Sequence, residues 1–260
     1  MEILVYILIF VLGMCLGSFV NMLVYRVAVK YGLKKPKFEV KNKDRSFCDG
    51  CGRQLKWYEN IPIVSWIIQK GKTRCCQKKL PILYPIVEII TGLLFLIYEI
   101  RFMIYESNLI LWILGLVIIT LLVFLTIFDL KYLILPDFAV VFLAITAVVM
   151  ILLVGLDIKI YLLSAIGSSL FLLILNLITR GKGMGWGDVK LAVFMGLFLG
   201  WPKILVAMYV AFIVGAIVGL ILLVSKKIKK KTPIAFGPFL ILGVIIAWWF
   251  GDLIMSIIRL

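Results

Sequence analysis

The sequence contains no histidine, and acidic residues are scarce in it. Only 13 Asp and Glu stand against 28 Lys and Arg in 260 residues. Without histidine the chain cannot use a Ser-His or Cys-His catalytic pair, an HExxH zinc site or an imidazole proton relay. An enzyme with this sequence would have to work with carboxylates, lysines, cysteines or an unassisted serine.

Charged residues make up only 16% of the sequence, and long stretches have none. A soluble domain of this length is about half apolar, whereas this chain is 64% apolar and its apolar residues come in blocks. The run from Leu109 to Phe128 contains no charged residue. At 1.5 Å per residue it would span about 30 Å, which is the thickness of the hydrocarbon core of a bilayer. We therefore expect an all-α polytopic membrane protein.

Eight apolar blocks predict about eight transmembrane helices. The first block lacks the basic n-region and the small-residue cleavage site of a signal peptide, so we expect it to be a retained helix. The sixth block is short and follows Gly187, which leaves a tilted or partly re-entrant helix as an alternative. The blocks cover residues 3–25, 82–100, 109–128, 138–155, 160–179, 189–200, 204–224 and 236–258.

The formal net charge of +15 is explained by membrane topology. If the N-terminus faces out, 24 of the 28 Lys and Arg lie in segments 26–81, 129–137, 180–190 and 225–235, which then face the cytoplasm. This asymmetry follows the positive-inside rule, with contact to anionic lipid as a by-product. It predicts the inner (cytoplasmic) membrane as the location and the lipid bilayer as a partner, and it gives no reason to expect nucleic acid binding. The outer face keeps only Arg101, Lys159, Lys203 and Arg259.

These features predict three parts along the chain. Residues 1–25 form the first transmembrane helix, residues 26–81 a small cytoplasmic domain, and residues 82–260 a membrane domain of seven helices. The middle part could fold in water, because it is basic and carries turn signals such as Asp49-Gly50 and Cys51-Gly52. It also holds four of the five cysteines. No internal repeat is evident in the sequence.

Four acidic residues lie inside or beside the apolar blocks on the predicted cytoplasmic side: Glu88, Asp129, Asp137 and Asp188. An ionisable group at membrane depth costs several kcal/mol, so each is a functional candidate. Asp137 has a simpler alternative, since it follows Pro136 and could cap the next helix.

Asp129 and Asp188 are the strongest catalytic candidates. Asp129 ends the third apolar block, and Asp188 follows two glycines that permit tight turns and close backbone approach. If the two carboxyl groups share one site, they cannot both ionise easily, so one acts as an acid while the other activates water. That is the chemistry of an aspartyl protease. The alternative is a pair of unrelated aspartates at helix ends.

Two motifs surround the candidate aspartates. Gly183 to Leu191 contains a GxGD pattern that ends at Asp188, and a second segment runs from Phe128 to Asp137. These segments resemble the GxGD signature and the first aspartate motif of the bacterial type IV prepilin peptidases, which are membrane aspartyl proteases, and the first aspartate of that motif corresponds to Asp129. The further matches, in order along the chain, are Gly17-Ser18-Phe19-Val20-Asn21 with Arg26, Asn60-Ile61-Pro62 with Ser65, Tyr84-Pro85-Ile86-Val87-Glu88 and Phe236-Gly237-Pro238-Phe239.

This resemblance implies eight helices with a cytoplasmic domain after the first. It implies cleavage of the short basic leader of type IV prepilin or pseudopilin precursors, after a glycine and at the cytoplasmic membrane face. It also implies methylation of the new N-terminus with S-adenosylmethionine, an activity tied in the family to the domain that holds Asn60, Pro62 and Ser65. Glu88 could add negative charge near the site or make an inter-helix hydrogen bond. Gly17, Asn21 and Arg26 could pack the first helix and tether the loop that follows it.

The cysteines depart from the family's pattern of two CxxC pairs, which resembles a zinc site. The first pair, Cys48 and Cys51, is intact, but Thr73 occupies the expected third position, and Cys75 and Cys76 follow it. Four thiolates suit tetrahedral zinc. We expect zinc at Cys48, Cys51, Cys75 and Cys76, with an incomplete or three-sulfur site as the alternative.

Other functions remain open on the sequence alone. The chain could be a GxGD intramembrane protease for other substrates. It could be a transporter whose Asp129, Asp137 and Asp188 line an ion path, or an inactive adaptor of pilus assembly. Carboxylates at helix ends, rather than at the bilayer midplane, favour the protease.

Overall fold

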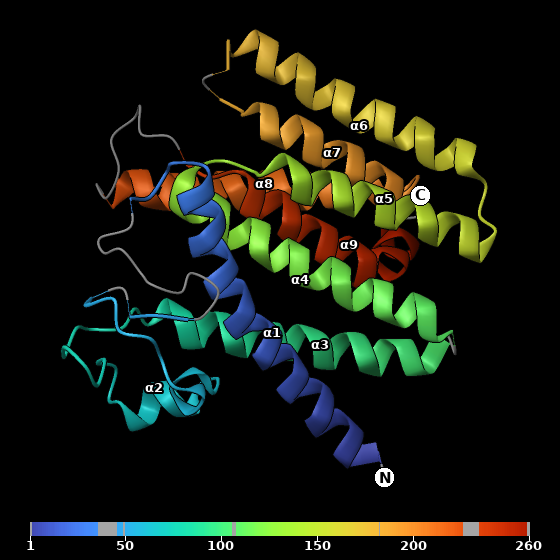
Figure 1. The fold of residues 1–260 in the computed structure, drawn as a ribbon. Coiled ribbons are helices and arrows are strands. Elements are labelled where there is room, and N and C mark those ends of the chain that lie inside the picture. The colour runs from blue at the N-terminus through green and yellow to red at the C-terminus, as the bar shows by residue number, and fades with distance from the viewer. Residues whose placement is uncertain are drawn as a thin grey trace. The chain divides into compact units, whose positions relative to one another are not determined.

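The computed structural model describes residues 2–35, 46–48, 50–105, 108–181, 183–225 and 234–258, and helices dominate them (Figure 1). The lysine-rich run 226–231, Asp49 and Arg259 lie outside the described residues.

Long helices account for most of the described chain. Each overlaps one of the eight predicted apolar blocks, so the expected all-α architecture is confirmed. Seven helices within the described residues are long and apolar enough to cross a membrane, which identifies a multi-pass membrane protein. The long helices are α1 (Glu2–Lys30), α3 (Leu83–Tyr105), α4 (Leu109–Tyr132), α5 (Asp137–Val154), α6 (Ile158–Ile178), α7 (Trp186–Leu199), α8 (Lys203–Val224) and α9 (Gly237–Ile258); η1 (Trp57–Asn60) and α2 (Val64–Ile68) are short.

Helix α7 is the exception among the predicted spans. Its 14 residues extend about 21 Å at 1.5 Å per residue, which is less than the bilayer core. It packs against α5, α6, α8 and α9, and Leu191, Phe194 and Met195 are fully buried. Trp186 and Val193 on the same helix are 60% and 37% exposed. Helix α7 is therefore largely covered by neighbouring helices but keeps one exposed side.

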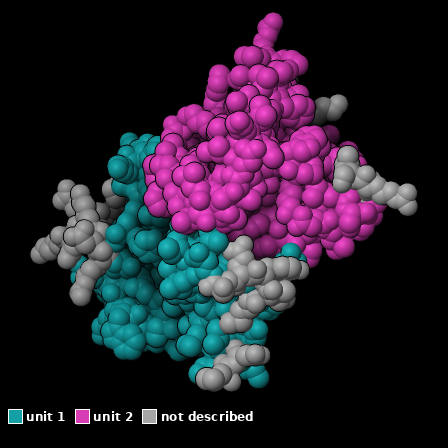
Figure 2. All heavy atoms as spheres, turned by 90° about the vertical axis from the view of Figure 1, so that its right-hand side faces the viewer, with its two compact units in different colours: residues 1–124 teal, residues 125–260 magenta. Residues whose placement is uncertain are grey.

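The chain divides into two compact units, Met1–Phe124 and Leu125–Leu260, which are coloured separately in Figure 2. The first contains α1, the cysteine-bearing segment, α3 and most of α4. The second contains the end of α4 and helices α5 to α9.

Glycines let α1 and α3 approach closely in the first unit. A Cβ on Gly13 would lie 2.8 Å from the Cα of Gly92, and one on Gly17 would lie 2.9 Å from the Cα of Glu88. Asn21 adds a polar link, because its Nδ2 donates to the carbonyl oxygen of Tyr84 at 3.3 Å. Small residues and side-chain hydrogen bonds are the usual means of helix association in membranes. The expected packing role of Gly17 and Asn21 is thereby confirmed.

In the second unit, α7 is held against α6 in the same way. A Cβ on Gly196 would lie 2.3 Å from the Cα of Ala165, so only glycine fits this crossing. The Ser168 hydroxyl donates to the carbonyl oxygen of Ala192 at 2.8 Å. These contacts fix the position of α7, whose first turn carries Asp188.

Candidate active site and cysteine cluster

Asp129 lies in the last turn of α4 and is buried. The helix continues past the predicted end at residue 128 to Tyr132, and Leu133 then takes a left-handed conformation with φ of +56° that turns the chain toward α5. The backbone N–H of Gly237, the first residue of α9, donates to Oδ2 of Asp129 at 3.0 Å. One carboxylate oxygen is therefore held by a helix that begins 108 residues later.

Asp188 is the third residue of α7 and is also buried. Its Oδ2 accepts a hydrogen bond of 2.9 Å from the backbone N–H of Gly185, which precedes the helix. A carboxylate in the first turn of a helix also faces the positive end of the helix dipole. The glycines of the GxGD segment thus hold the Asp188 side chain in place.

The structure brings Asp129 and Asp188 into one site within the second unit. Leu135 contacts the residues next to both aspartates. A Cβ on Gly187, which precedes Asp188, would lie 3.0 Å from the Cβ of Leu135. A Cβ on Gly237, which binds Asp129, would lie 3.3 Å from the Cδ2 of Leu135. Both carboxyl groups are buried at this place. Two buried carboxyls so placed can share a proton and polarise a water molecule between them.

Asp137 does not belong to this buried pair. It is the first residue of α5, its side chain is 64% exposed, and it forms a 2.7 Å ion pair with Lys190 on α7. Pro136 is the N-cap, and no side-chain cap bond forms there. Asp137 thus opens the helix as expected, but its carboxylate joins α5 to α7 and does not cap the helix. An exposed ion pair of this kind contributes about 0–1 kcal/mol.

Asn176 supports the site and was not among the predicted residues. It is buried in α6, and its Nδ2 donates to the carbonyl oxygen of Met184 at 2.6 Å, inside the GxGD segment. The only signal in the sequence is an isolated amide in an apolar helix. The role of Gly237 was equally hidden, because a backbone donor carries no side-chain signature.

The sequence left two roles open for Glu88, a negative charge near the site or a hydrogen bond between segments, and the structure shows the hydrogen bond. Within the first unit, its Oε2 accepts from the backbone N–H of Ile63 at 2.7 Å. Glu88 therefore joins α3 to the segment before α2.

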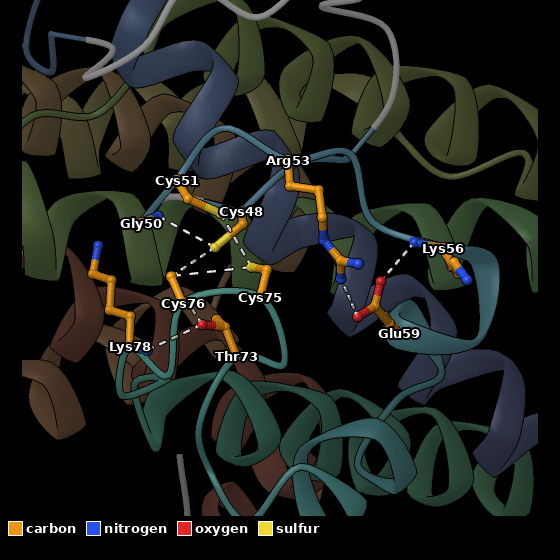
Figure 3. A network of polar contacts seen from close by, with 10 residues as sticks. All are labelled: Cys48, Gly50, Cys51, Arg53, Lys56, Glu59, Thr73, Cys75, Cys76 and Lys78. Carbon is orange, nitrogen blue, oxygen red and sulfur yellow. Dashed lines mark hydrogen bonds and ion pairs between the residues drawn. The ribbon is translucent and has the colours of Figure 1, made fainter.

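The four predicted cysteines converge in the first unit, with all their sulfur atoms within 4.8 Å of one another (Figure 3). The Sγ–Sγ distances are 3.7 Å for Cys48 and Cys76, 3.2 Å for Cys51 and Cys75, and 4.0 Å for Cys75 and Cys76. A tetrahedron of sulfurs around zinc, with Zn–S bonds of about 2.3 Å, has edges of about 3.8 Å. The cluster fits such a metal, and the thiols are not joined in disulfides.

Thr73 is buried beside this cluster. Its hydroxyl lies 3.2 Å from Cys76 Sγ and accepts a hydrogen bond of 3.1 Å from the backbone N–H of Lys78. A hydrogen bond from the Thr73 hydroxyl and a smaller effect of the Lys78 backbone N–H lower the pKa of the Cys76 thiol to about 6. A thiol with so low a pKa is ready to bind metal as a thiolate.

An ion pair connects the cluster to η1. Arg53, two residues after Cys51, pairs with the buried carboxylate of Glu59 at 2.6 Å, and Glu59 also accepts from the Lys56 backbone N–H at 2.8 Å (Figure 3). Next to this element lies a cavity of about 540 Å³, lined by Ser46, Gln54, Leu55, Lys56, Trp57, Tyr58 and Asn60.

Comparison with known families matches two consecutive parts of the chain. Residues 11–102 match the family described as the bacterial peptidase A24 N-terminal domain. Residues 116–220 match the type IV leader peptidase family. The second match contains both Asp129 and Asp188, and the first contains all four clustered cysteines.

Curated relatives are similar over nearly the whole chain. A protein of Bacillus subtilis is 32% identical over 251 residues, which cover 96% of both chains. A protein of Aeromonas salmonicida is 30% identical and covers 94% of this chain and 90% of its own length. One of Pseudomonas aeruginosa is 31% identical, covering 93% of this chain and 89% of its own. Each is named prepilin leader peptidase/N-methyltransferase. No solved structure matches the chain.

Proposed function

Because this chain belongs to the type IV leader peptidase family, we propose that Asp129 and Asp188 are the carboxyl pair with which it hydrolyses its peptide substrates. The observation that supports this assignment is the convergence of two buried carboxyls from different helices, each held through Oδ2 by a backbone N–H. The exposed Asp137 lacks that environment.

The mechanism needs no residue beyond the pair and a water molecule. One carboxylate takes a proton from the water as it attacks the scissile carbonyl carbon, while the protonated partner donates to the carbonyl oxygen. Collapse of the tetrahedral intermediate then breaks the C–N bond, with a carboxyl proton transferred to the leaving amine. Because Gly237 and Gly185 bind the Oδ2 atoms, we assign the Oδ1 atoms to the water and the substrate.

We propose that the substrates are type IV prepilins, which the relatives' names specify, or the similar pseudopilin precursors. A basic leader stays on the cytoplasmic side of the membrane by the positive-inside rule, and the segments that carry Asp129 and Asp188 are assigned to the same side. We place these segments at the cytoplasmic face, with the chain in the inner membrane, because of the distribution of basic residues.

Cleavage in vitro tests the substrate class. The full-length protein in detergent is mixed with a prepilin precursor, and the products are identified by mass spectrometry. We expect a single cut after the glycine that ends the leader. A precursor whose glycine is replaced by a bulky residue is the matched control and should remain intact. Cleavage of unrelated membrane helices, with the prepilin left uncut, would instead support a general intramembrane protease.

The relatives' names also include N-methyltransferase. We propose that S-adenosylmethionine, the methyl donor, binds in the cavity beside η1. The cavity has a volume suited to a nucleoside-sized ligand, and it offers two aromatic rings, the amides of Gln54 and Asn60 and the cation of Lys56. Aromatic rings stack on adenine, amides can hydrogen-bond to it, and a lysine can pair with the cofactor's carboxylate. When bound, the cofactor supplies the methyl group for the new N-terminal amine.

Direct binding tests this location without relying on turnover. Trp57 is 79% exposed at the cavity, so Trp57→Ala should weaken binding of S-adenosylmethionine, measured by equilibrium dialysis, by about tenfold. Trp201→Ala, which removes another exposed tryptophan, is the control. Equal binding by both variants would place the cofactor elsewhere.

We also propose that Cys48, Cys51, Cys75 and Cys76 bind one structural zinc ion. The sulfur spacing supports this, and so does the small size of the segment between α1 and α3, which has little core of its own. Strong chelation should release the zinc and loosen this segment, which limited proteolysis would detect.

A further inference from the structure

The two cysteine segments form the same backbone loop twice, 25 residues apart, although the sequence shows no repeat. An isolated bridge between Phe47 and Gln54 closes the first loop, and one between Lys72 and Lys79 closes the second. Each pair is separated by the same number of residues. The two loops therefore begin and end at equivalent positions.

Backbone hydrogen bonds repeat with the same offset. The N–H of Cys48 donates to the carbonyl of Arg53 at 2.8 Å, and the N–H of Thr73 donates to that of Lys78 at 2.9 Å. The carbonyl oxygens of Cys48 and Thr73 each accept a bond of 2.9 Å from the residue four positions on. Those donors, Gly52 and Gln77, both have positive φ, of 73° and 56°. Thr73 is thus the structural equivalent of Cys48.

The equivalence extends to the third position of each loop, held by Gly50 in the first and Cys75 in the second. A Cβ on Gly50 would lie 2.6 Å from the Sγ of Cys76, in the opposite loop. Reciprocally, the Sγ of Cys75 lies 3.2 Å from the Sγ of Cys51. A side chain at this position therefore points into the cluster from either loop.

We propose that Cys75 and Thr73 together replace Cys48 in the second loop: Cys75 provides the metal-binding sulfur, and Thr73 provides the backbone position. This inference rests on the zinc site proposed above. Cys75 supplies the fourth sulfur from the third loop position, and the glycine at the equivalent position across the cluster, Gly50, leaves room for the Cys76 sulfur. Thr73 keeps the backbone contacts of the first position, while its hydroxyl supports the Cys76 sulfur at 3.2 Å. The ligand set is complete although the second CxxC pair is not.

Zinc content of the purified full-length protein, with each variant loaded and then dialysed against a weak chelator, tests the proposal. We expect Cys75→Ala to lose the zinc that wild type retains. Thr73→Cys combined with Cys75→Ala moves the sulfur back to the first loop position and should restore retention to the wild-type level. Cys15→Ala removes the exposed cysteine of α1 and is the matched control, which should change nothing. Cobalt absorption then reports whether four thiolates bind in both retaining proteins.

The role of the Thr73 hydroxyl is tested separately, by zinc retention in variants of Thr73. Thr73→Val removes the hydroxyl while keeping the shape, and it should weaken zinc retention about 10- to 100-fold, as loss of a ligand's supporting hydrogen bond does. Thr73→Ser should rescue it. Gly50→Ala should also reduce zinc retention, because its methyl group would meet the Cys76 sulfur.

The outcomes separate this inference from the zinc proposal itself. A wild-type protein that takes up no zinc overturns both. A wild-type protein that holds zinc while Cys75→Ala retains it equally overturns only the assignment of Cys75. Failure of the Thr73→Cys, Cys75→Ala double variant to recover zinc, while Cys15→Ala retains it, overturns the equivalence of the two loops.

Discussion

At the scale of single residues, the candidate active site depends on backbone donors as much as on carboxylates. Asp129 and Asp188 could be singled out from the sequence, because acidic residues at the ends of apolar runs are rare and costly. The backbone groups that bind them could not be identified from the sequence. Gly237 reaches Asp129 through its backbone N–H across 108 residues, and no side-chain pattern encodes such a contact. Leu135, which lies against both Gly187 and Gly237, is an ordinary apolar residue in the sequence.

Gly237→Ala tests the backbone support of Asp129. A Cβ at this position would lie 2.7 Å from Asp129 Oδ2, so the carboxylate must shift. We expect peptide cleavage to fall about 10- to 100-fold, since misplacing a catalytic group by about 1 Å can cost that much. Alanine favours helices more than glycine does, so the fold should persist. Gly167→Ala, which meets nothing within 4 Å, is the control; equal activity in the two variants would contradict this role for Gly237.

Asn176→Asp tests the anchoring of the GxGD segment. The change keeps the size of the side chain but replaces the amide donor, which bonds to the Met184 carbonyl at 2.6 Å, with a group that repels it. Cleavage should fall about tenfold or more as Asp188 loses its fixed position. Ser169→Ala, on the exposed side of the same helix, should have little effect. An Asn176→Asp protein with wild-type turnover would remove Asn176 from the site.

At the scale of helices, apolar runs predicted the elements well but not their ends or their roles. Helix α1 was expected to end at residue 25, yet it continues to Lys30, because charged residues do not terminate a helix that has left the bilayer. It stops where Gly32 adopts a positive φ of 69°. Helix α7 has the composition of a membrane span, but most of its residues are buried against other helices. Periodicity and composition do not distinguish burial in lipid from burial in protein.

Gly196→Val tests the close crossing of α6 and α7. The new side chain would collide with the backbone of Ala165, whose Cα lies 2.3 Å from the added Cβ position. We expect a loss of about 1–3 kcal/mol or more of stability, seen as a lower unfolding temperature in detergent, together with lost cleavage because α7 carries Asp188. Gly167→Val on the other helix faces open space and should unfold near the wild-type temperature. Similar unfolding of all three proteins would argue against this packing.

At the scale of the whole molecule, hydrophobic blocks and the placement of basic residues organise the chain. The class of fold followed from the sequence because each span must satisfy its backbone hydrogen bonds within a helix. The duplicated loop around the cysteines could not be predicted from the sequence, because only its hydrogen-bond pattern repeats. Most residue types differ between the two loops, with a few exceptions such as Cys51 and Cys76. The orientation in the membrane remains a prediction from the 24 basic residues assigned to one side.

Reporter insertion tests that orientation. Alkaline phosphatase is active only outside the cytoplasm, so its insertion after Leu156 should give active enzyme, whereas insertion after Arg180 should give none. These two positions lie in the turns at opposite ends of α6. The reverse pattern would invert the topology and place the two aspartates on the outer face.

The central claim is that Asp129 and Asp188 together carry out peptide hydrolysis, and the most direct measurement is prepilin cleavage by Asp129→Asn, Asp188→Asn and Asp137→Asn. All three changes replace a carboxyl group with a neutral amide of nearly the same size. We expect the first two to lose about 10²- to 10⁴-fold in rate, as removal of an acid or base does. The third, which breaks an exposed ion pair, should stay within about tenfold of wild type. Wild-type rates in a folded Asp129→Asn or Asp188→Asn protein would contradict the account.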